Sequence, residues 1–525
     1  MSVDTDNAAF QDALNLIQYT RQSVFLTGKA GTGKSTFLRY VCEHTKKKYV
    51  VLAPTGIAAI NAGGSTMHSF FKLPFYPLLP DDPNLSLQRG RIHEFFKYTK
   101  PHRKLLEQIE LIIIDEISMV RADIIDAIDR ILRVYSHNLR EPFGGKQLLL
   151  VGDVFQLEPV VKNDEREILN RFYPTPYFFS ARVFGQIDLV SIELQKVYRQ
   201  TDPVFVGVLD HIRTNTAGAA DLQLLNTRYG SQIEESEADM YITLATRRDT
   251  VDSINEKKLA ELPGESITFE GVIEGDFPES SLPTSQELVL KPGAQIIFIK
   301  NDFDRRWVNG TIGVIAGIDE EEETIYVITD DGKECDVKRD SWRNIRYRYN
   351  EKTKEIEEEV LGSFTQYPIR LAWAITVHKS QGLTFSRVVI DFTGGVFAGG
   401  QAYVALSRCT SLDGIQLKKP INRADIFVRP EIVNFAGRFN NRQAIDKALK
   451  QAQADVQYAA AARAFNKGDM EECLEQFFRA IHSRYDIEKP VPRRLIRRKL
   501  GIINTLKEQN KKLKEQMREQ QERLR

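Results

Sequence analysis

The chain has 525 residues, of which 42% are hydrophobic and 27% are charged, and its formal net charge is zero. At roughly 150 residues per domain this length predicts three or four domains, and the composition is that of a folded protein rather than a disordered one. A net charge of zero excludes a protein that coats nucleic acid through bulk electrostatics, so any contact with nucleic acid is expected to be local.

Cysteine spacing and apolar runs bear on the cellular compartment. The cysteines at 42, 335, 409 and 473 form no C-x-x-C pair, so neither a zinc ribbon nor a disulfide framework is indicated, and a reducing cytoplasm fits. The N-terminus lacks a basic region followed by an apolar run, and no stretch of about 18 apolar residues occurs. We therefore expect a cytoplasmic protein without membrane contact.

Short apolar runs alternate with helical stretches, which predicts parallel sheets covered on both faces. The first series of runs comprises 23–27, 49–53, 111–114, 147–151 and 188–194. A second series begins at Tyr241 and resumes at Ile369 and Val388. The fold class is therefore α/β with two such domains, expected at 1–185 and at 186–285 plus 361–435.

Two insertions are expected within these domains. A Pro-rich stretch followed by a basic segment predicts a small wedge at about 70–103. Alternating β-formers and an Asp-Asp-Gly-Lys hairpin signal predict a small β-barrel at 286–360.

The C-terminal part has a helical pattern. Residues 442–466 and 470–485 predict a hairpin at 436–486 that resembles one tetratricopeptide unit, which cannot form a solenoid alone. Residues 484–525 carry a net charge of +8, which leaves −8 for residues 1–483. The tail at 487–525 is thus basic.

A phosphate-binding loop lies at 28–35, where the chain reads GKAGTGKS between a strand and a helix. Glycines allow backbone N–H groups to surround phosphates, Lys34 supplies a charge to the β and γ oxygens, and the Ser35 hydroxyl is a ligand for magnesium. The other expected nucleotide contacts are Gly28, Ala30, Gly31, Thr32, Gly33 and Thr36.

Two carboxylates end the apolar strand at 111–114. Asp115 is expected to hold Mg²⁺, and Glu116 to orient or deprotonate the attacking water. Together the loop and the carboxylates predict hydrolysis of a nucleoside triphosphate, and they leave open the work that hydrolysis drives.

Further blocks follow in a fixed order along residues 10–410. They are APTGIAA at 53–59, TMHSFF at 66–71, GDVFQLEPV at 152–160, VYRQ at 197–200, TVHKSQGLT at 376–384 and QAYVALSR at 401–408. In this order they resemble the motifs of superfamily-one helicases of the group that moves 5′ to 3′. The stretch 123–147, leading into GDVFQLEPV, resembles the Pif-one family in particular, although Glu158 stands where that family often has proline.

The resemblance implies further residues at the nucleotide. Arg199 and Arg408 suit arginine fingers, which we expect to reach the phosphate loop only when the second domain closes over it. Gln156 is expected to sense the γ-phosphate, and Tyr198 to stack on adenine. Two weaker assignments are Gln11, for which Asn7, Gln18 and Gln22 are alternatives, and Gly382.

The resemblance also implies a path for DNA. The matching positions are Pro54, Thr55, His68, Thr376, His378 and Lys379. Phe70 and Phe71 fit either the core or a platform on which bases stack.

These residues predict a bacterial, nucleoid-associated DNA helicase that uses ATP and Mg²⁺ and binds single-stranded and duplex DNA. DNA repair, recombination and telomere maintenance are the processes that the resemblance implies. The alternatives are a RecD-like motor, an RNA-directed motor and a switch protein gated by a nucleotide.

Three heptads in the tail leave its role open. Ile503, Leu506, Asn510, Leu513, Met517, Gln520 and Leu524 fall at alternating spacings of three and four. The spacing predicts a seam for self-association or for a partner helix. The basic residues just upstream instead predict a loose grip on phosphates, or a solvated helix without a role.

Overall fold

The computed structural model describes residues 4–87, 91–200, 202–230, 240–353, 355–483 and 490–523. The chain divides into two compact units, Met1–Asn441 and Arg442–Arg525. Each unit is described by itself.

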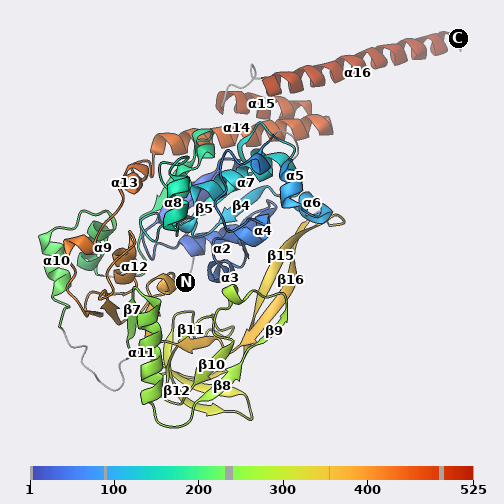
Figure 1. Ribbon diagram of the computed structural model, residues 1–525. Coiled ribbons are helices and arrows are strands. Elements are labelled where there is room, and N and C mark those ends of the chain that lie inside the picture. The colour runs from blue at the N-terminus through green and yellow to red at the C-terminus, as the bar shows by residue number, and fades with distance from the viewer. Residues whose placement is uncertain are drawn as a thin grey trace. The chain divides into compact units, whose positions relative to one another are not determined.

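The first unit contains a six-stranded sheet in the order β3-β2-β4-β5-β1-β6, and all of its neighbouring strands are parallel. Its strands are β1 (Val24–Gly28), β2 (Tyr49–Ala53), β3 (Ser65–Thr66), β4 (Leu111–Ile114), β5 (Gln147–Val151) and β6 (Val190–Leu194). Side chains of β1, β4 and β5 are buried along their whole length, as expected for strands with helices on both faces (Figure 1). The predicted first series of strands is confirmed.

One expected boundary is wrong. The run at 188–194 belongs to the predicted first series, but the expected boundary at residue 185 leaves it outside the first domain. Instead β6 pairs in parallel with β1, with Val24 opposite Val190 and Gly28 opposite Leu194. The first domain therefore extends through Leu194, because this strand covers the open edge of β1.

Helices pack around this sheet. They are α1 (Ala8–Tyr19), α2 (Lys34–His44), α3 (Gly56–Ala62), α4 (Met67–Phe71), α5 (Arg91–Phe96), α6 (Lys100–Gln108), α7 (Ala122–Tyr135) and α8 (Asn163–Leu169). Asn7 begins α1 by accepting the N–H groups of Ala9 and Phe10 with its side chain.

Three buried aspartates on α7 hold neighbouring segments in place. Asp123 accepts the N–H of Leu78, Asp126 accepts the N–H of Val183, and Asp129 accepts the N–H of Phe143. A buried carboxylate needs such donors, because an unpaired charge inside a protein is costly. The stretch that resembles the Pif-one signature thus serves as a scaffold for the loops around it.

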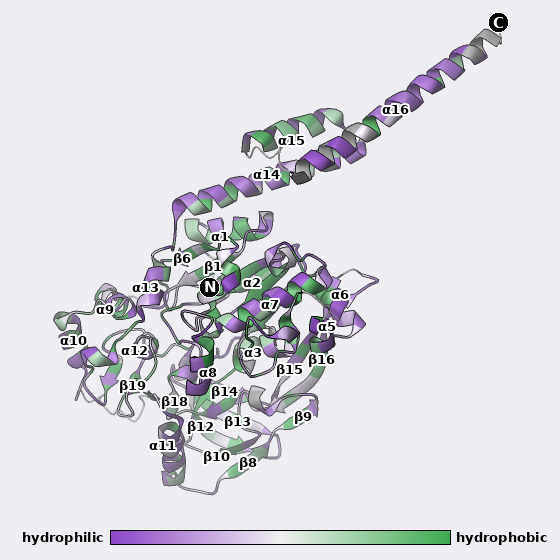
Figure 2. Ribbon diagram, turned by 45° about the horizontal axis from the view of Figure 1, so that its top comes forward, coloured by the Kyte–Doolittle hydropathy of each residue, from purple (hydrophilic) through white to green (hydrophobic). Residues whose placement is uncertain are grey.

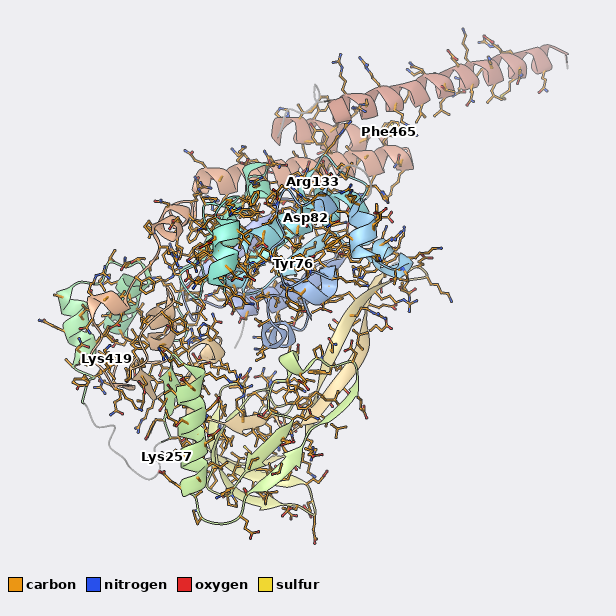
Figure 3. The ribbon with its side chains drawn as sticks, viewed as in Figure 1. Tyr76, Asp82, Arg133, Lys257, Lys419 and Phe465 are labelled. Carbon is orange, nitrogen blue, oxygen red and sulfur yellow. The ribbon has the colours of Figure 1, made fainter. Side chains whose placement is uncertain are left out.

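The expected wedge region packs on the first domain through apolar side chains. Leu73, Leu78, Leu85, Ile92 and Phe96 are buried in the same core as the sheet. Arg130 of α7 donates to the carbonyls of Pro80 and Leu85, and Tyr76 remains exposed (Figure 3).

The second sheet has the order β18-β7-β19-β20, with parallel neighbours. Its strands are β7 (Ile242–Ala245), β18 (Ala374–Thr376), β19 (Val388–Asp391) and β20 (Ile415–Leu417). The accompanying helices are α9 (Pro203–Arg213), α10 (Ala219–Asn226), α11 (Arg248–Glu261) and α12 (Gln401–Leu406). The next helix, α13 (Pro430–Ala436), buries Ile432 and Phe435 in the core of the first domain.

Antiparallel strands are inserted between β7 and β18. A five-stranded sheet has the order β14-β13-β12-β11-β17, and β10 pairs with β8. The five-stranded sheet consists of β11 (Gln295–Phe298), β12 (Ile312–Asp319), β13 (Thr324–Thr329), β14 (Glu334–Val337) and β17 (Ile369–Leu371), and the separate pair consists of β8 (Ile267–Glu270) and β10 (Glu287–Leu290). The run at Ile369 was expected in the second parallel sheet, and this is wrong, because β17 pairs antiparallel with β11.

A long ribbon joins the inserted strands to the first domain. It consists of β15 (Asp340–Asn350), β16 (Glu355–Gln366) and β9 (Val272–Gly275), and it extends toward α6 (Figure 1). Tyr347 lies in the core of the first domain, and its hydroxyl accepts the N–H of Val51 at 3.3 Å. The inserted strands therefore run from Ile267 to Gln366 and β17, beyond the expected range 286–360.

The second unit contains three helices, α14 (Arg442–Lys467), α15 (Met470–Ser483) and α16 (Pro490–Arg523). Gly468, at φ 86°, makes the turn between α14 and α15, and the rings of Tyr458 and Phe477 lie 5.9 Å apart across the hairpin. Hydrophilic residues dominate α16 (Figure 2). In the described ranges, no helix has the length and apolar character needed to cross a membrane.

Candidate active site

The loop after β1 has the backbone that a phosphate site requires. Gly31 and Gly33 have φ values of 80° and 88°, which favour glycine, and α2 begins at Lys34. A Cβ atom on Gly31 would lie 2.4 Å from the Cβ of Arg199, so no larger residue fits there. The amides of the loop and the N-terminus of α2 form a site for an anion.

Lys34 lies within this loop. Its Nζ donates to the carbonyls of Gly28 and Lys29 at 2.6 and 3.1 Å. Burial lowers the pKa of Lys34, while the charges of Asp153 and Glu116 oppose that shift. These carboxylates keep a buried ammonium group compensated.

Asp115 and Glu116 follow β4 directly. The Asp115 carboxylate accepts the N–H of Glu116 at 3.0 Å, and Glu116 has a left-handed backbone at φ 51°. A non-glycine residue in this conformation is strained, and such strain concentrates at functional sites. Burial, together with the charge of Asp115, raises the pKa of Glu116 to about 7. A base poised near neutral pH suits the removal of a proton from water.

A buried ionic network supports Gln156. Arg213 of α9 pairs with Asp153 at 3.1 Å and with Glu193 at 2.8 Å. Gln156 Nε2 lies 3.5 Å from Asp153 Oδ2. Neither Asp153 nor Arg213 was predicted from the sequence, although Asp153 belongs to the block that carries Gln156. No motif in the sequence points to Arg213, because it lies 60 residues away from its partner Asp153.

The two expected arginine fingers lie at the junction of the two α/β domains. Arg199 donates to the carbonyls of Ser407 and Gly382 at 3.3 and 3.4 Å. Its neighbour Tyr198 donates its N–H to the carbonyl of Gly31 at 2.9 Å. The expectation that Arg199 lies out of reach of the phosphate loop until closure is wrong, because the strand β6 that precedes it belongs to the first sheet.

Arg408 is 1% exposed and is held by backbone carbonyls. It donates to Val404 at 3.0 Å, to Ser380 at 3.2 Å and to Leu383 at 3.3 Å. Burial and the charge of Arg199 lower the pKa of Arg408 to about 9. Two cations are therefore kept close together, which an anion between them would stabilise.

Two further contacts join the phosphate loop to the second domain. The N–H of Ala30 donates to the Tyr403 hydroxyl at 3.0 Å, and Lys29 pairs with Asp210. Tyr403 lies in the block that carries Arg408, but a tyrosine at this position did not by itself predict a hydrogen bond with Ala30. These contacts make the loop part of the interface between the domains.

The proposed adenine contacts lie near the N-terminus. The Tyr198 hydroxyl donates to Asp4 at 2.7 Å, and a Cβ atom on Gly33 would lie 3.9 Å from the Tyr198 ring. Gln11 donates to the carbonyl of Thr5 at 2.8 Å. Tyr198 is thus placed beside the loop, while the Gln11 amide is engaged with the N-terminal segment.

The expected DNA contacts of the first domain follow β2 and β3. Thr55 caps α3 by accepting the N–H of Ala58, directly after Pro54. The His68 ring stacks on Phe75, with centroids 5.0 Å apart, and burial lowers the pKa of His68. Phe75 is 83% exposed, whereas Phe70 and Phe71 are buried. Phe75 is therefore the available platform.

The expected DNA contacts of the second domain follow β18. The Thr376 hydroxyl accepts the N–H of Lys379 at 3.3 Å. The His378 ring stacks on Phe397 with centroids 6.3 Å apart, and Phe397 is 61% exposed. Each domain thus presents a histidine beside an exposed phenylalanine. Neither Phe75 nor Phe397 was predicted from the sequence.

The fold and this site define a P-loop nucleotide hydrolase built from two RecA-like domains. Residues 4–207 match the family described as PIF1-like helicase. The ATP-dependent DNA helicase Pif1 of Campylobacter jejuni is 34% identical over 412 residues, which cover 75% of this chain and 88% of that protein. The enzyme of the same name from Bdellovibrio bacteriovorus is 31% identical, with 81% and 90% covered.

Solved structures agree with this match. Bacteroides Pif1 in complex with ADP-AlF4 is 41% identical, with a TM-score of 0.75 and coverage of 83% of this chain and 97% of that one. Bacteroides Pif1 bound to ssDNA has a TM-score of 0.60 at 41% identity, with coverage of 85% and 99%. This chain belongs to the PIF1-like helicase family. It spans 60% of the length of the PIF1 helicase of Emericella nidulans, at 32% identity over 79% of this chain.

Proposed function

We propose that this chain is an ATP-dependent DNA helicase that moves 5′ to 3′ on single-stranded DNA and unwinds duplexes or other DNA structures. The observation that carries the proposal is the hydrogen bond from Ala30 of the phosphate loop to Tyr403 of the second domain, with Arg199, which packs against Gly31, bonded to Ser407. The second domain therefore contacts the phosphate loop directly. Hydrolysis at this loop is thereby coupled to the angle between the domains.

The residues present fit Mg²⁺. The Ser35 hydroxyl and the Asp115 carboxylate are hard oxygen ligands at the ends of α2 and β4, which is the chemistry that magnesium prefers. Bound Mg²⁺ would neutralise negative charge on the phosphates. Lys34 holds the β and γ oxygens, and Glu116 takes the proton of the attacking water. Arg199 and Arg408 stabilise charge on the γ-phosphate in the transition state, while Gln156 senses that phosphate.

The strand is gripped by both domains. Pro54, Thr55 and His68 serve the first domain, and Thr376, His378 and Lys379 serve the second. Phe75 and Phe397 supply stacking surfaces, each contributing about 1–3 kcal/mol per base. When the domains close and open, the two grips exchange the strand and displace its complement.

The same proposal places the protein on the bacterial nucleoid, with DNA repair or recombination as its setting. It divides the motor into domains at 1–194 and at 195–266 plus 372–429, with the antiparallel insert inside the second, and residues 430–441 return to the first domain. The C-terminal unit adds a further contact, either to DNA or to protein.

Unwinding of tailed duplexes tests this proposal. Duplexes with a 5′ single-stranded tail are expected to be unwound and those with a 3′ tail to remain intact, with ATP hydrolysis stimulated by single-stranded DNA. Lys34→Ala is the control, since it removes the charge on the phosphates but keeps the loop amides, so DNA binding survives. Hydrolysis that single-stranded DNA does not stimulate would favour a switch protein, and preference for a 2′-OH-containing strand would favour an RNA-directed motor.

A further inference from the structure

A cleft of about 770 Å³ lies beside the proposed DNA grip of the second domain. One wall is α11 of the second RecA-like domain, and the other comprises β10 and β17 of the antiparallel insert. Thr376 and Lys379, two of the proposed DNA contacts, line its edge. The cleft is therefore continuous with the path proposed for the strand.

Arg370 of β17 projects into this cleft as an uncompensated cation. Its guanidinium makes neither a hydrogen bond nor an ion pair with any residue in the described part of the chain. Burial lowers the pKa of Arg370 to about 10, with no carboxylate opposing the shift. A half-buried cation without a partner is unfavourable in the free protein.

Three more basic side chains line the same cleft, those of Arg248, Lys291 and Lys379, and Lys291 donates to the carbonyl of Leu262 at 3.0 Å. Burial, then the charges of Arg370 and Arg248, lower the pKa of Lys379, and the charge of Asp252 opposes that shift. Of the acidic residues in the lining, Asp252 is paired with Arg248 at 3.3 Å, while Glu256 and Glu287 are exposed. The Lys379 ammonium has no ion pair among the described residues. Arg370 and Lys379 are thus available to an anion.

We propose that Arg370, together with Lys379, binds a phosphodiester of the single strand within this cleft. The inference rests on the proposed function and adds Arg370 as a positioning residue supplied by the insert. The planar guanidinium matches two phosphate oxygens at once, and the cleft has the volume of a pocket for one small ligand, which suits a nucleotide unit rather than a duplex. Binding therefore ties the insert to the second RecA-like domain.

The test compares the full chain with Arg370→Gln, which removes the charge at similar size, and Arg370→Lys, which keeps it. Binding of a fluorescent single-stranded oligonucleotide is measured from about 50 to 200 mM salt. We expect Arg370→Gln to weaken binding by roughly tenfold at low salt and to reduce the slope of log K against log salt by about 0.7, with Arg370→Lys retaining the wild-type slope.

Lys257→Gln is the matched control, because Lys257 lies on α11 but outside the lining of the cleft (Figure 3). It should leave the salt slope unaltered. Since Arg370 is unpaired, Arg370→Gln is expected to unfold at or above the wild-type temperature, whereas a structural role predicts a lower midpoint. An unchanged slope in Arg370→Gln, or equal losses in the Gln and Lys variants with a lowered midpoint, would overturn the inference. The proposed function fails separately, if the wild-type chain shows no DNA-stimulated hydrolysis.

Discussion

The backbone N–H of Ala30 and the hydroxyl of Tyr403 are joined by a hydrogen bond of 3.0 Å, although 373 positions separate them in the chain. Ala30 packs in the hydrophobic core of the second RecA-like domain rather than in that of its own domain. A residue of the phosphate loop is thus packed and bonded as part of its neighbour. Any movement between the domains must change the surroundings of this loop.

Tyr403→Phe should therefore uncouple DNA binding from hydrolysis. The substitution removes the acceptor for Ala30 and leaves a buried N–H unsatisfied, at a cost of about 1–3 kcal/mol. We expect weaker stimulation of ATP hydrolysis by single-stranded DNA, with oligonucleotide affinity retained. Steady-state hydrolysis across DNA concentrations measures this, and Tyr229→Phe, at an exposed tyrosine, is the control. Full stimulation in Tyr403→Phe would show that the hydrogen bond has no coupling role.

Arg199→Ala is expected to act on turnover rather than on binding. A finger that stabilises charge in the transition state is worth roughly 10³ to 10⁵ in rate, while ATP affinity should remain within about tenfold. Arg199 suits this test because its contacts are two carbonyls at 3.3 and 3.4 Å at the domain junction.

Arg408→Ala should show the same kinetic change together with a loss of stability. Arg408 is buried and donates to three backbone carbonyls, so its removal takes one donor from each of them. Single-turnover hydrolysis and nucleotide titration separate the two effects. Loss of affinity with unchanged turnover would assign either arginine to ground-state binding.

The raised pKa of Glu116 predicts a pH dependence of stability. Its folded pKa of about 7 exceeds the ordinary value of 4.5, so the folded state holds a proton that the unfolded state releases between these values. Stability should therefore fall as pH rises from about 4.5 to 7, by up to about 3 kcal/mol for this group. Glu116→Gln should remove this part of the dependence and also abolish hydrolysis.

Denaturant unfolding of the nucleotide-free protein and of Glu116→Gln, at several pH values, checks the prediction. The difference between the two proteins should grow across that window and level off above pH 7. A difference that does not change with pH would mean that the Glu116 pKa is close to its ordinary value.

The sequence predicts those parts of the fold that depend on local pattern. Apolar runs predicted the strands of the first sheet. The glycine and carboxylate motifs pointed to Lys34 and Glu116, because each of these sites is built from residues that are adjacent in the sequence. Pattern does not specify which strand a run pairs with, which is why β17 was expected in the wrong sheet and the first domain was expected to end before β6. Contacts made only by folding, such as Arg213 with Asp153, have no local signature.

The exposure of individual side chains could not be predicted from the sequence either. Phe71 and Phe75 are four residues apart, and only the structure shows that one is buried and the other is 83% exposed. The three aspartates of α7 likewise read as a polar helix face. Their burial follows from loop N–H groups that converge on them from Leu78, Phe143 and Val183.

The basic tail gives the last prediction. In α16, Arg493, Arg494, Arg497 and Arg498 are exposed, and the seam residues Leu506, Leu513 and Met517 are 58%, 58% and 62% exposed. Three heptads make a marginal coiled coil, whereas a charge of +8 in residues 484–525 suits phosphates. We therefore expect the tail to act as a loose second grip on DNA.

Truncation after residue 485 should then keep DNA-stimulated hydrolysis but weaken oligonucleotide binding, most clearly at low salt. Replacing the four arginines by glutamine should reproduce this loss, because it removes the charge and keeps the seam. Leu506→Asp with Leu513→Asp disrupts the seam and keeps the arginines, so it should bind DNA as the wild-type chain does, apart from a small effect of the added negative charge. Sedimentation of all three proteins separates the two roles. The opposite result has two parts: the Leu506 and Leu513 changes abolish a larger species, and replacement of the arginines leaves DNA binding unchanged. That result would assign the tail to self-association, because only the seam would then matter.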